Sequence, residues 1–134
     1  MENYQLDTNA LLRYLAHDIP SKYQKVRYLF NKAKNGQVTL NICEPVFIET
    51  AVMLKQYFKF PKDKVVDFLH DLLNASYLNI ENSSRLAPAI DIYSQNSIDL
   101  VDAIVLVRAY INNQQIFTFD SKLSLLASSR EKAN

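Results

Sequence analysis

The sequence predicts an α/β protein with a parallel sheet that helices cover on both faces. Short apolar runs of strand length alternate with longer segments of helical periodicity. The chain has 134 residues, of which 49% are hydrophobic and 22% charged, which is typical of a globular protein rather than a disordered one. This length suits one core, and we expect a single domain over residues 1–134.

The elements follow one another in a regular order. Strands are expected at residues 4–6, 38–40, 77–80 and 116–119. Helices are expected at residues 8–16, 21–34, 44–58 and 61–72, from residue 83 or 84 to 92, at 100–111, and from residue 121 onward. Ser21 is expected to cap the second helix and Gly36 to end it, while Pro45 and Pro61 open the next two.

Composition excludes several classes of function. The formal net charge is +1, so nucleic-acid binding would require a local basic patch. The single Cys43 allows no internal disulfide, and no signal peptide is evident, which favours the cytoplasm. One glycine in the whole chain argues against glycine-rich phosphate loops.

Three aspartates stand where a ligand site would form. Asp7 and Asp120 each follow an expected strand, and Asp102 lies in the first turn of its helix. An aspartate at a helix start can simply cap it, by about 0.5–2 kcal/mol. However, the carboxyl ends of parallel strands share one edge, where ligands bind, so both interpretations stay open.

Asp102 and Asp99 are one turn apart and are expected to differ. Asp102 shares a helix face with Val105, Leu106 and Ala109, and we expect that face to pack inward. Asp99 is the better candidate for a pure cap.

Glu49 lies in the middle of a helix, at the border of its expected buried side. A charge there needs a partner. That partner could be Arg13, Arg108 or a metal ion.

Four converging carboxylates would repel one another. Two unit charges 5 Å apart cost about 3 kcal/mol at an effective dielectric of 20. Divalent cations relieve this, and ligands that are all oxygen favour Mg²⁺ or Mn²⁺ over Zn²⁺. Neither His17 nor His70 has ligand-like spacing to an acid. Such ions activate water for phosphodiester hydrolysis.

Four segments together resemble the PIN-domain family, in particular the VapC toxins of bacterial toxin–antitoxin pairs. They are LDTNALLRYL, VFIETAVMLKQYF, DLVDAIVLVRA and FTFDSKL, which span nearly the whole chain. The resemblance implies an α/β/α sandwich with a central parallel sheet of four or five strands. It also implies a Mg²⁺-dependent ribonuclease and a homodimer bound by an antitoxin.

The same resemblance assigns residues to the site. The catalytic and metal-binding acids match Asp7, Glu49, Asp102 and Asp120. Thr8 or Asn9 matches the polar residues that orient the first acid. Thr118 matches the hydroxyl-bearing residue two positions before the last acid. Asp99 matches no core position.

A basic and aromatic stretch could contact RNA or a protein partner. The candidate contacts are Arg13, Lys55, Lys59 and Lys62. Lysines supply phosphate contacts, and the aromatic residues Tyr57, Phe58 and Phe60 could stack on bases. The alternative is a solvated face with its aromatics in the core.

Two other functions stay open at this point. One is an RNA-processing nuclease with a housekeeping role, and the other is a non-catalytic scaffold whose acids only cap helices.

Overall fold

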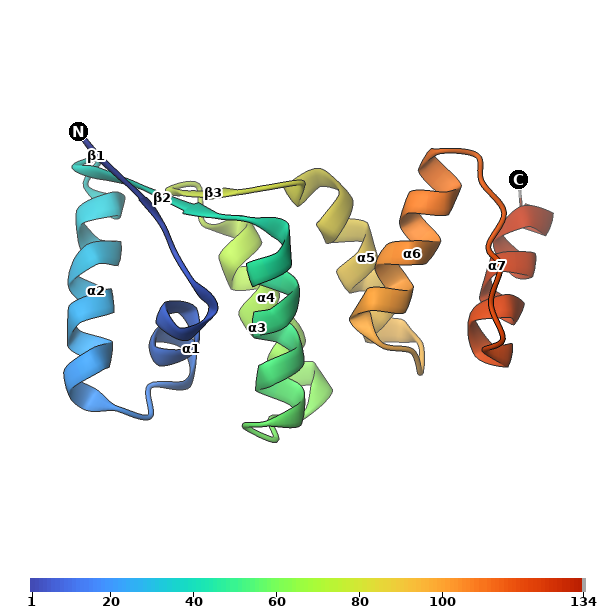
Figure 1. Cartoon of the computed structure of the whole chain (residues 1–134), viewed down its shortest axis with the longest axis horizontal. Coiled ribbons are helices and arrows are strands. Elements are labelled where there is room, and N and C mark those ends of the chain that lie inside the picture. Colours follow the sequence, from blue (N-terminus) through green and yellow to red (C-terminus); the bar gives the residue numbers. More distant parts are fainter. Residues whose placement is uncertain (134) are drawn as a thin grey trace. The chain divides into compact units, whose positions relative to one another are not determined.

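The computed structural model describes residues 1–133 and forms two compact units, Met1–Ser83 and Ser84–Asn134, which are considered in turn. Their elements are labelled in Figure 1. Within the described residues, no helix combines the length and the apolar character that crossing a membrane requires.

The first unit is built on a parallel sheet of three strands, in the order β1-β2-β3. The strands are β1 (Glu2–Gln5), β2 (Val38–Ile42) and β3 (Leu78–Ile80). Tyr4 pairs with Leu40, and Ile42 pairs with Ile80. The α/β class with a parallel sheet flanked by helices is therefore confirmed, although the described residues form three strands where four or five were predicted.

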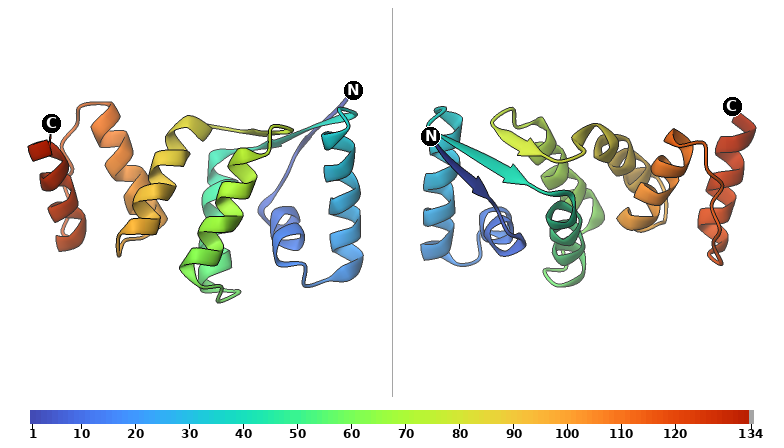
Figure 2. Two further views of the ribbon diagram at one scale, coloured as in Figure 1. Left: turned by 180° about the vertical axis from the view of Figure 1, so that it is seen from behind. Right: turned by 45° about the horizontal axis from the view of Figure 1, so that its top comes forward.

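Two helices follow each of the first two strands. They are α1 (Thr8–Ala16), α2 (Pro20–Lys34), α3 (Glu44–Gln56) and α4 (Lys62–Asn74). Figures 1 and 2 show all four on the same side of the sheet, so the described helices of this unit cover one face where both were expected. The side chains of β2 alternate accordingly, with Val38, Leu40 and Ile42 buried while Asn41 is half-buried. Phe47 of α3 and Leu69 of α4 are fully buried and complete this core.

Most helix ends lie where the sequence predicts them, but the predicted cap of α2 is wrong. The helix begins at Pro20 rather than after Ser21, with Ile19 at the N-cap position. Proline at the first helical position is favourable because its missing N–H would have no partner there. Gly36 does end the helical segment, with φ +74°, a conformation that costs glycine little.

The start of α3 is tied to the end of β3. The backbone N–H of Glu44 donates to the Glu81 carboxylate at 3.0 Å, and Asn82 Nδ2 donates to Glu44 Oε2 at 2.6 Å. Glu44 is only 8% exposed and lies in the first turn of the helix. These bonds fix the N-terminal end of the helix that carries Glu49.

The second unit is helical and consists of α5 (Ser83–Gln95), α6 (Leu100–Ile111) and α7 (Ser121–Ala133), with its core on the faces that the helices share. Its buried side chains include Leu86, Ile90, Leu106 and Leu123. Their spacing within α5 is four residues, as expected for one helix face.

The fourth predicted strand, residues 116–119, is not a strand in this structure. The segment runs without regular structure between α6 and α7, and Phe117 and Phe119 are 91% and 96% exposed. A strand needs a neighbour for its backbone N–H and C=O groups, and the described residues of the second unit include no other strand.

Candidate acidic site

Asp7 lies just beyond β1 and caps α1. Its backbone is extended, and one carboxylate oxygen accepts from the backbone N–H of Ala10 at 2.8 Å. The preceding Leu6 is buried and anchors the end of the strand. The capping bond uses Oδ1, which leaves the second oxygen of this exposed carboxylate available to a ligand.

Glu49 is exposed on α3, which corrects its expected place at the border of the buried side. The buried polar residue is its neighbour Thr50, whose hydroxyl donates to the Val46 carbonyl at 2.7 Å. Since Glu49 is solvated, no cationic partner is needed. Arg13, one of the partners considered, instead pairs with Asp18 at 2.7 Å.

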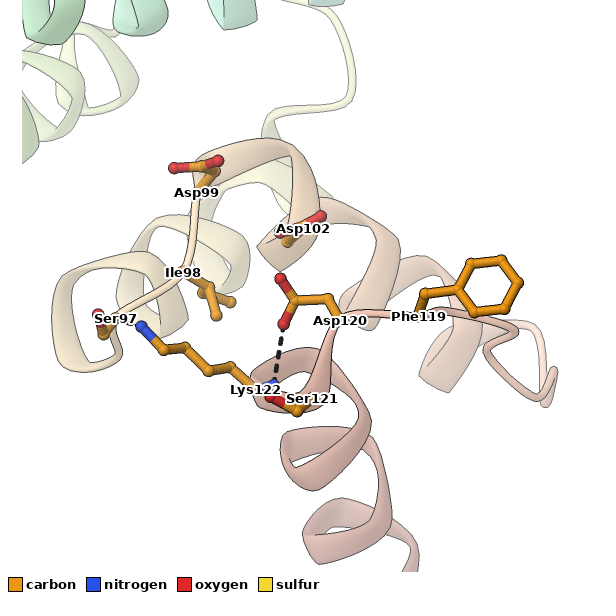
Figure 3. A pocket seen from close by; sticks show the side chains of 8 residues that line it. All are labelled: Ser97, Ile98, Asp99, Asp102, Phe119, Asp120, Ser121 and Lys122. Carbon is orange, nitrogen blue, oxygen red and sulfur yellow. Dashed lines mark hydrogen bonds between the residues drawn. The ribbon is translucent and has the colours of Figure 1, made fainter.

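The second unit holds a pocket with a volume of about 380 Å³ (Figure 3). Its acidic lining residues are Asp99, Asp102 and Asp120, and its single basic one is Lys122. Figure 3 shows the Asp102 and Asp120 carboxylates next to each other, with Asp99 at the start of α6. Two of the four predicted site acids therefore face the same pocket.

The Asp120 carboxylate is held by the backbone at the start of α7, and the Asp120 backbone is held by Thr118. Its Oδ1 accepts from the backbone N–H groups of Lys122 at 2.9 Å and Leu123 at 3.0 Å. Its backbone N–H donates to the Thr118 hydroxyl oxygen at 3.0 Å. Oδ1 is thus occupied by the helix start, while Oδ2 makes neither of these bonds.

Asp99 occupies the N-cap position of α6, but its side chain makes no capping hydrogen bond. Its expected role as a pure cap is therefore wrong. Nor is the whole predicted inward face buried, because Val105 is 40% exposed while Leu106 and Ala109 are buried. Asp102 lies at the edge of the buried face and is half-exposed.

We expect substitutions of Asp120 and Asp99 to change the free energy of unfolding by different amounts. Asp120→Ala should lower the free energy of unfolding by about 1 kcal/mol, because two backbone N–H groups lose their acceptor. Asp120→Asn should change it by only a few tenths, since asparagine caps equally well. Asp99→Ala should stay within about 0.5 kcal/mol of the parent. Urea denaturation measures all three, and equal losses for Asp99→Ala and Asp120→Ala would contradict this assignment.

The pKa of Asp102 is raised from its ordinary value of 3.8, first by burial and then by the negative charges of Asp120 and Asp99. The folded, metal-free protein therefore binds a proton at Asp102 more readily than the unfolded chain does. This carboxylate consequently destabilises the fold as pH rises through its folded-state pKa.

We therefore expect Asp102→Asn to be more stable than the parent at pH 7 when metal is removed. The difference should shrink as pH falls and should disappear well below pH 3.8, where the aspartate is protonated in both states. Urea denaturation in EDTA at both pH values measures this. A variant that is less stable at pH 7 would show that Asp102 makes a favourable contact when charged.

The other predicted residues have these surroundings. Within the described residues, no side-chain hydrogen bond joins Thr8 or Asn9 to Asp7. Lys55 and Lys59 are exposed, Lys62 is half-buried, and Arg13 lies over the Phe58 ring at 5.8 Å. The sequence interpretation missed three polar residues of the pocket, Ser97, Ser121 and Lys122, because none has a distinctive spacing.

The donor chemistry of these acids suits a hard divalent cation. All candidate ligands are carboxylate oxygens, and Asp7 and Asp120 each keep one oxygen outside the capping bonds. The raised pKa of Asp102 reflects in part a repulsion that a bound cation would relieve. Among the described residues, no three His, Cys, Asp or Glu side chains form a group that could hold a metal ion.

Comparison with known proteins gives two similarities. The family profile of the PIN domain matches residues 4–128. A VapC ribonuclease from Aquifex aeolicus (strain VF5) is 25% identical over 104 residues, which cover 78% of this chain and 76% of that protein.

Proposed function

The chain belongs to the PIN-domain family, and from this premise we propose that it is a Mg²⁺-dependent endoribonuclease that acts as the toxin of a toxin–antitoxin pair. The observation that carries the proposal is the pocket shared by Asp102 and Asp120 at the starts of consecutive helices. Similarity to a VapC ribonuclease supports RNA as the substrate. The family match spans both units, which supports one PIN domain over residues 1–134.

The proposed metal ligands and catalytic acids are Asp7, Glu49, Asp102 and Asp120. Mg²⁺, or Mn²⁺ in its place, would lower the pKa of a bound water and stabilise charge at phosphorus during hydrolysis. The carboxylates contribute the negative charge that retains the ion.

Polar neighbours would hold these acids in place. Thr118 supports Asp120 through the backbone N–H of that residue, and the helix start fixes one of its oxygens. We assign Thr8 and Asn9 the corresponding role beside Asp7, on the strength of the sequence motif. Lys122 and Leu123 supply the two backbone donors.

We further propose an RNA substrate, a cognate antitoxin and a homodimer, all in the cytoplasm. Arg13, Lys55, Lys59 and Lys62 are the candidate contacts to RNA or to a protein partner. Exposure of Lys55 and Lys59 supports this role. Sedimentation at several protein concentrations tests the dimer, and a monomer at every concentration would reject it.

The test of function is RNA cleavage by the purified protein. We expect single-stranded RNA to be cut in Mg²⁺ or Mn²⁺ and to stay intact in EDTA. Expression with and without the gene adjacent to this one, followed by mapping of RNA ends, distinguishes a toxin from a housekeeping nuclease. Cleavage that persists unchanged in EDTA would reject the metal-dependent mechanism, and no cleavage under any condition would favour a scaffold.

A further inference from the structure

Lys122 is the one basic residue among the eight that line the acidic pocket. Its ammonium donates to the Ser97 hydroxyl at 3.2 Å, across the pocket from its own helix (Figure 3). The bond links the start of α7, which follows Asp120, to the segment that leads into Asp99 and α6. The lysine is thereby directed along the pocket wall rather than into bulk solvent.

The ammonium of Lys122 forms no ion pair with the pocket acids among the described residues. An ammonium has three N–H donors, and the bond to Ser97 uses one of them. Two donors and a positive charge are therefore left at the edge of a pocket that otherwise carries carboxylates. Of the charged side chains that line this pocket, the aspartates would repel a negatively charged group and Lys122 would attract it.

We propose that Lys122 is a substrate-binding residue that contacts a phosphate oxygen of single-stranded RNA bound at this pocket. The inference rests on the proposed nuclease function and adds to it a specific anion contact. Lys122 has two roles, one for its backbone N–H, which donates to the Asp120 carboxylate, and one for its side chain. A substitution can change the second role without the first. The backbone N–H holds Asp120 Oδ1 whatever the side chain is, and the side chain alone reaches Ser97 and the pocket.

Three variants separate charge from tethering. Lys122→Met removes the charge and keeps the length of the side chain, Lys122→Arg keeps the charge, and Ser97→Ala removes the tether while leaving the ammonium. Lys122 and Ser97 are both exposed, so none of these changes disturbs the core. RNA affinity is measured by fluorescence anisotropy of a labelled single-stranded oligonucleotide over a range of NaCl concentrations in Mn²⁺, with Mn²⁺ affinity measured separately without RNA.

We expect Lys122→Met to weaken RNA binding about tenfold and to reduce the slope of log affinity against log salt by about 0.7, the value for one phosphate contact on a single strand. Its KM for cleavage should rise similarly, with kcat changed less than threefold. Its affinity for Mn²⁺ should stay equal or become tighter, because a positive charge has left the pocket. Lys122→Arg and Ser97→Ala should keep RNA affinity within about threefold of the parent.

The inference is overturned if Lys122→Met leaves the salt slope unchanged. It is also overturned if Ser97→Ala lowers RNA affinity as much as Lys122→Met does. Parallel losses of Mn²⁺ and RNA affinity in Lys122→Met would likewise assign the lysine a structural role. If the parent cleaves RNA and the RNA affinity of Lys122→Met equals that of the parent, this inference is rejected and the proposed function is not. If the parent does not cleave RNA, the proposed function fails, and the salt slopes for RNA binding still decide for or against Lys122.

Discussion

Asp7→Asn should lower the rate of RNA cleavage by at least about 100-fold while leaving the metal-free protein as stable as the parent. Mutation of an outer residue that only orients a metal ligand lowers metal affinity or activity about 10–100-fold. Loss of the charge on a ligand itself should therefore lower activity at least as much. The capping bond from Ala10 to Asp7 survives the change, because an asparagine oxygen accepts it equally well.

Asp67→Asn provides the matched control. Asp67 is an exposed aspartate on α4 of the same unit, and its loss changes the net charge equally. We expect it to cleave RNA at the parental rate. Activity and unfolding in urea are measured for both variants. An Asp7→Asn protein that retains cleavage would reduce Asp7 to a helix cap alone.

The two interpretations of the acids, capping and metal binding, are compatible in this structure. Asp7 and Asp120 each present one oxygen to the backbone N–H groups of a helix start. That bond fixes the orientation of the carboxylate at the helix start. The second oxygen is then presented in a fixed direction, as a metal ligand requires. Capping thus prepares these residues for the proposed site rather than competing with it.

Sequence periodicity predicted the helices well because their buried faces are continuous. The expected bounds of α1 and α6 agree with the structure at both ends. The alternating apolar residues of segment 116–119 fit a strand, but a strand is stable only beside a partner strand. Among the described residues of the helical second unit the segment has no partner strand, and it is irregular.

The candidate site was predictable where a residue's role follows from its position along the chain. Asp7 and Asp120 start helices, as their place after apolar segments indicated. By contrast, the burial of Glu44 and the exposure of Glu49 depend on which helix face meets the sheet. Asp99 lacks its expected capping bond because a favourable residue type at the N-cap position does not dictate the side-chain conformation.

Under the proposed function, divalent cations should stabilise the folded protein, because the proposed carboxylate site would bind them in the folded chain and not in the unfolded one. At a free concentration 100 times the dissociation constant, Mg²⁺ or Mn²⁺ should raise the free energy of unfolding by about 2.7 kcal/mol. Urea denaturation in EDTA and in each ion measures the gain. Asp102→Asn should lose most of it, although that variant starts from a more stable metal-free state at pH 7. A gain in stability that the parent shows and Asp102→Asn lacks separates specific metal binding from a general salt effect, since screening would act on both proteins alike. Equal gains in the parent and in Asp102→Asn, or none in either, would remove Asp102 from the proposed metal site.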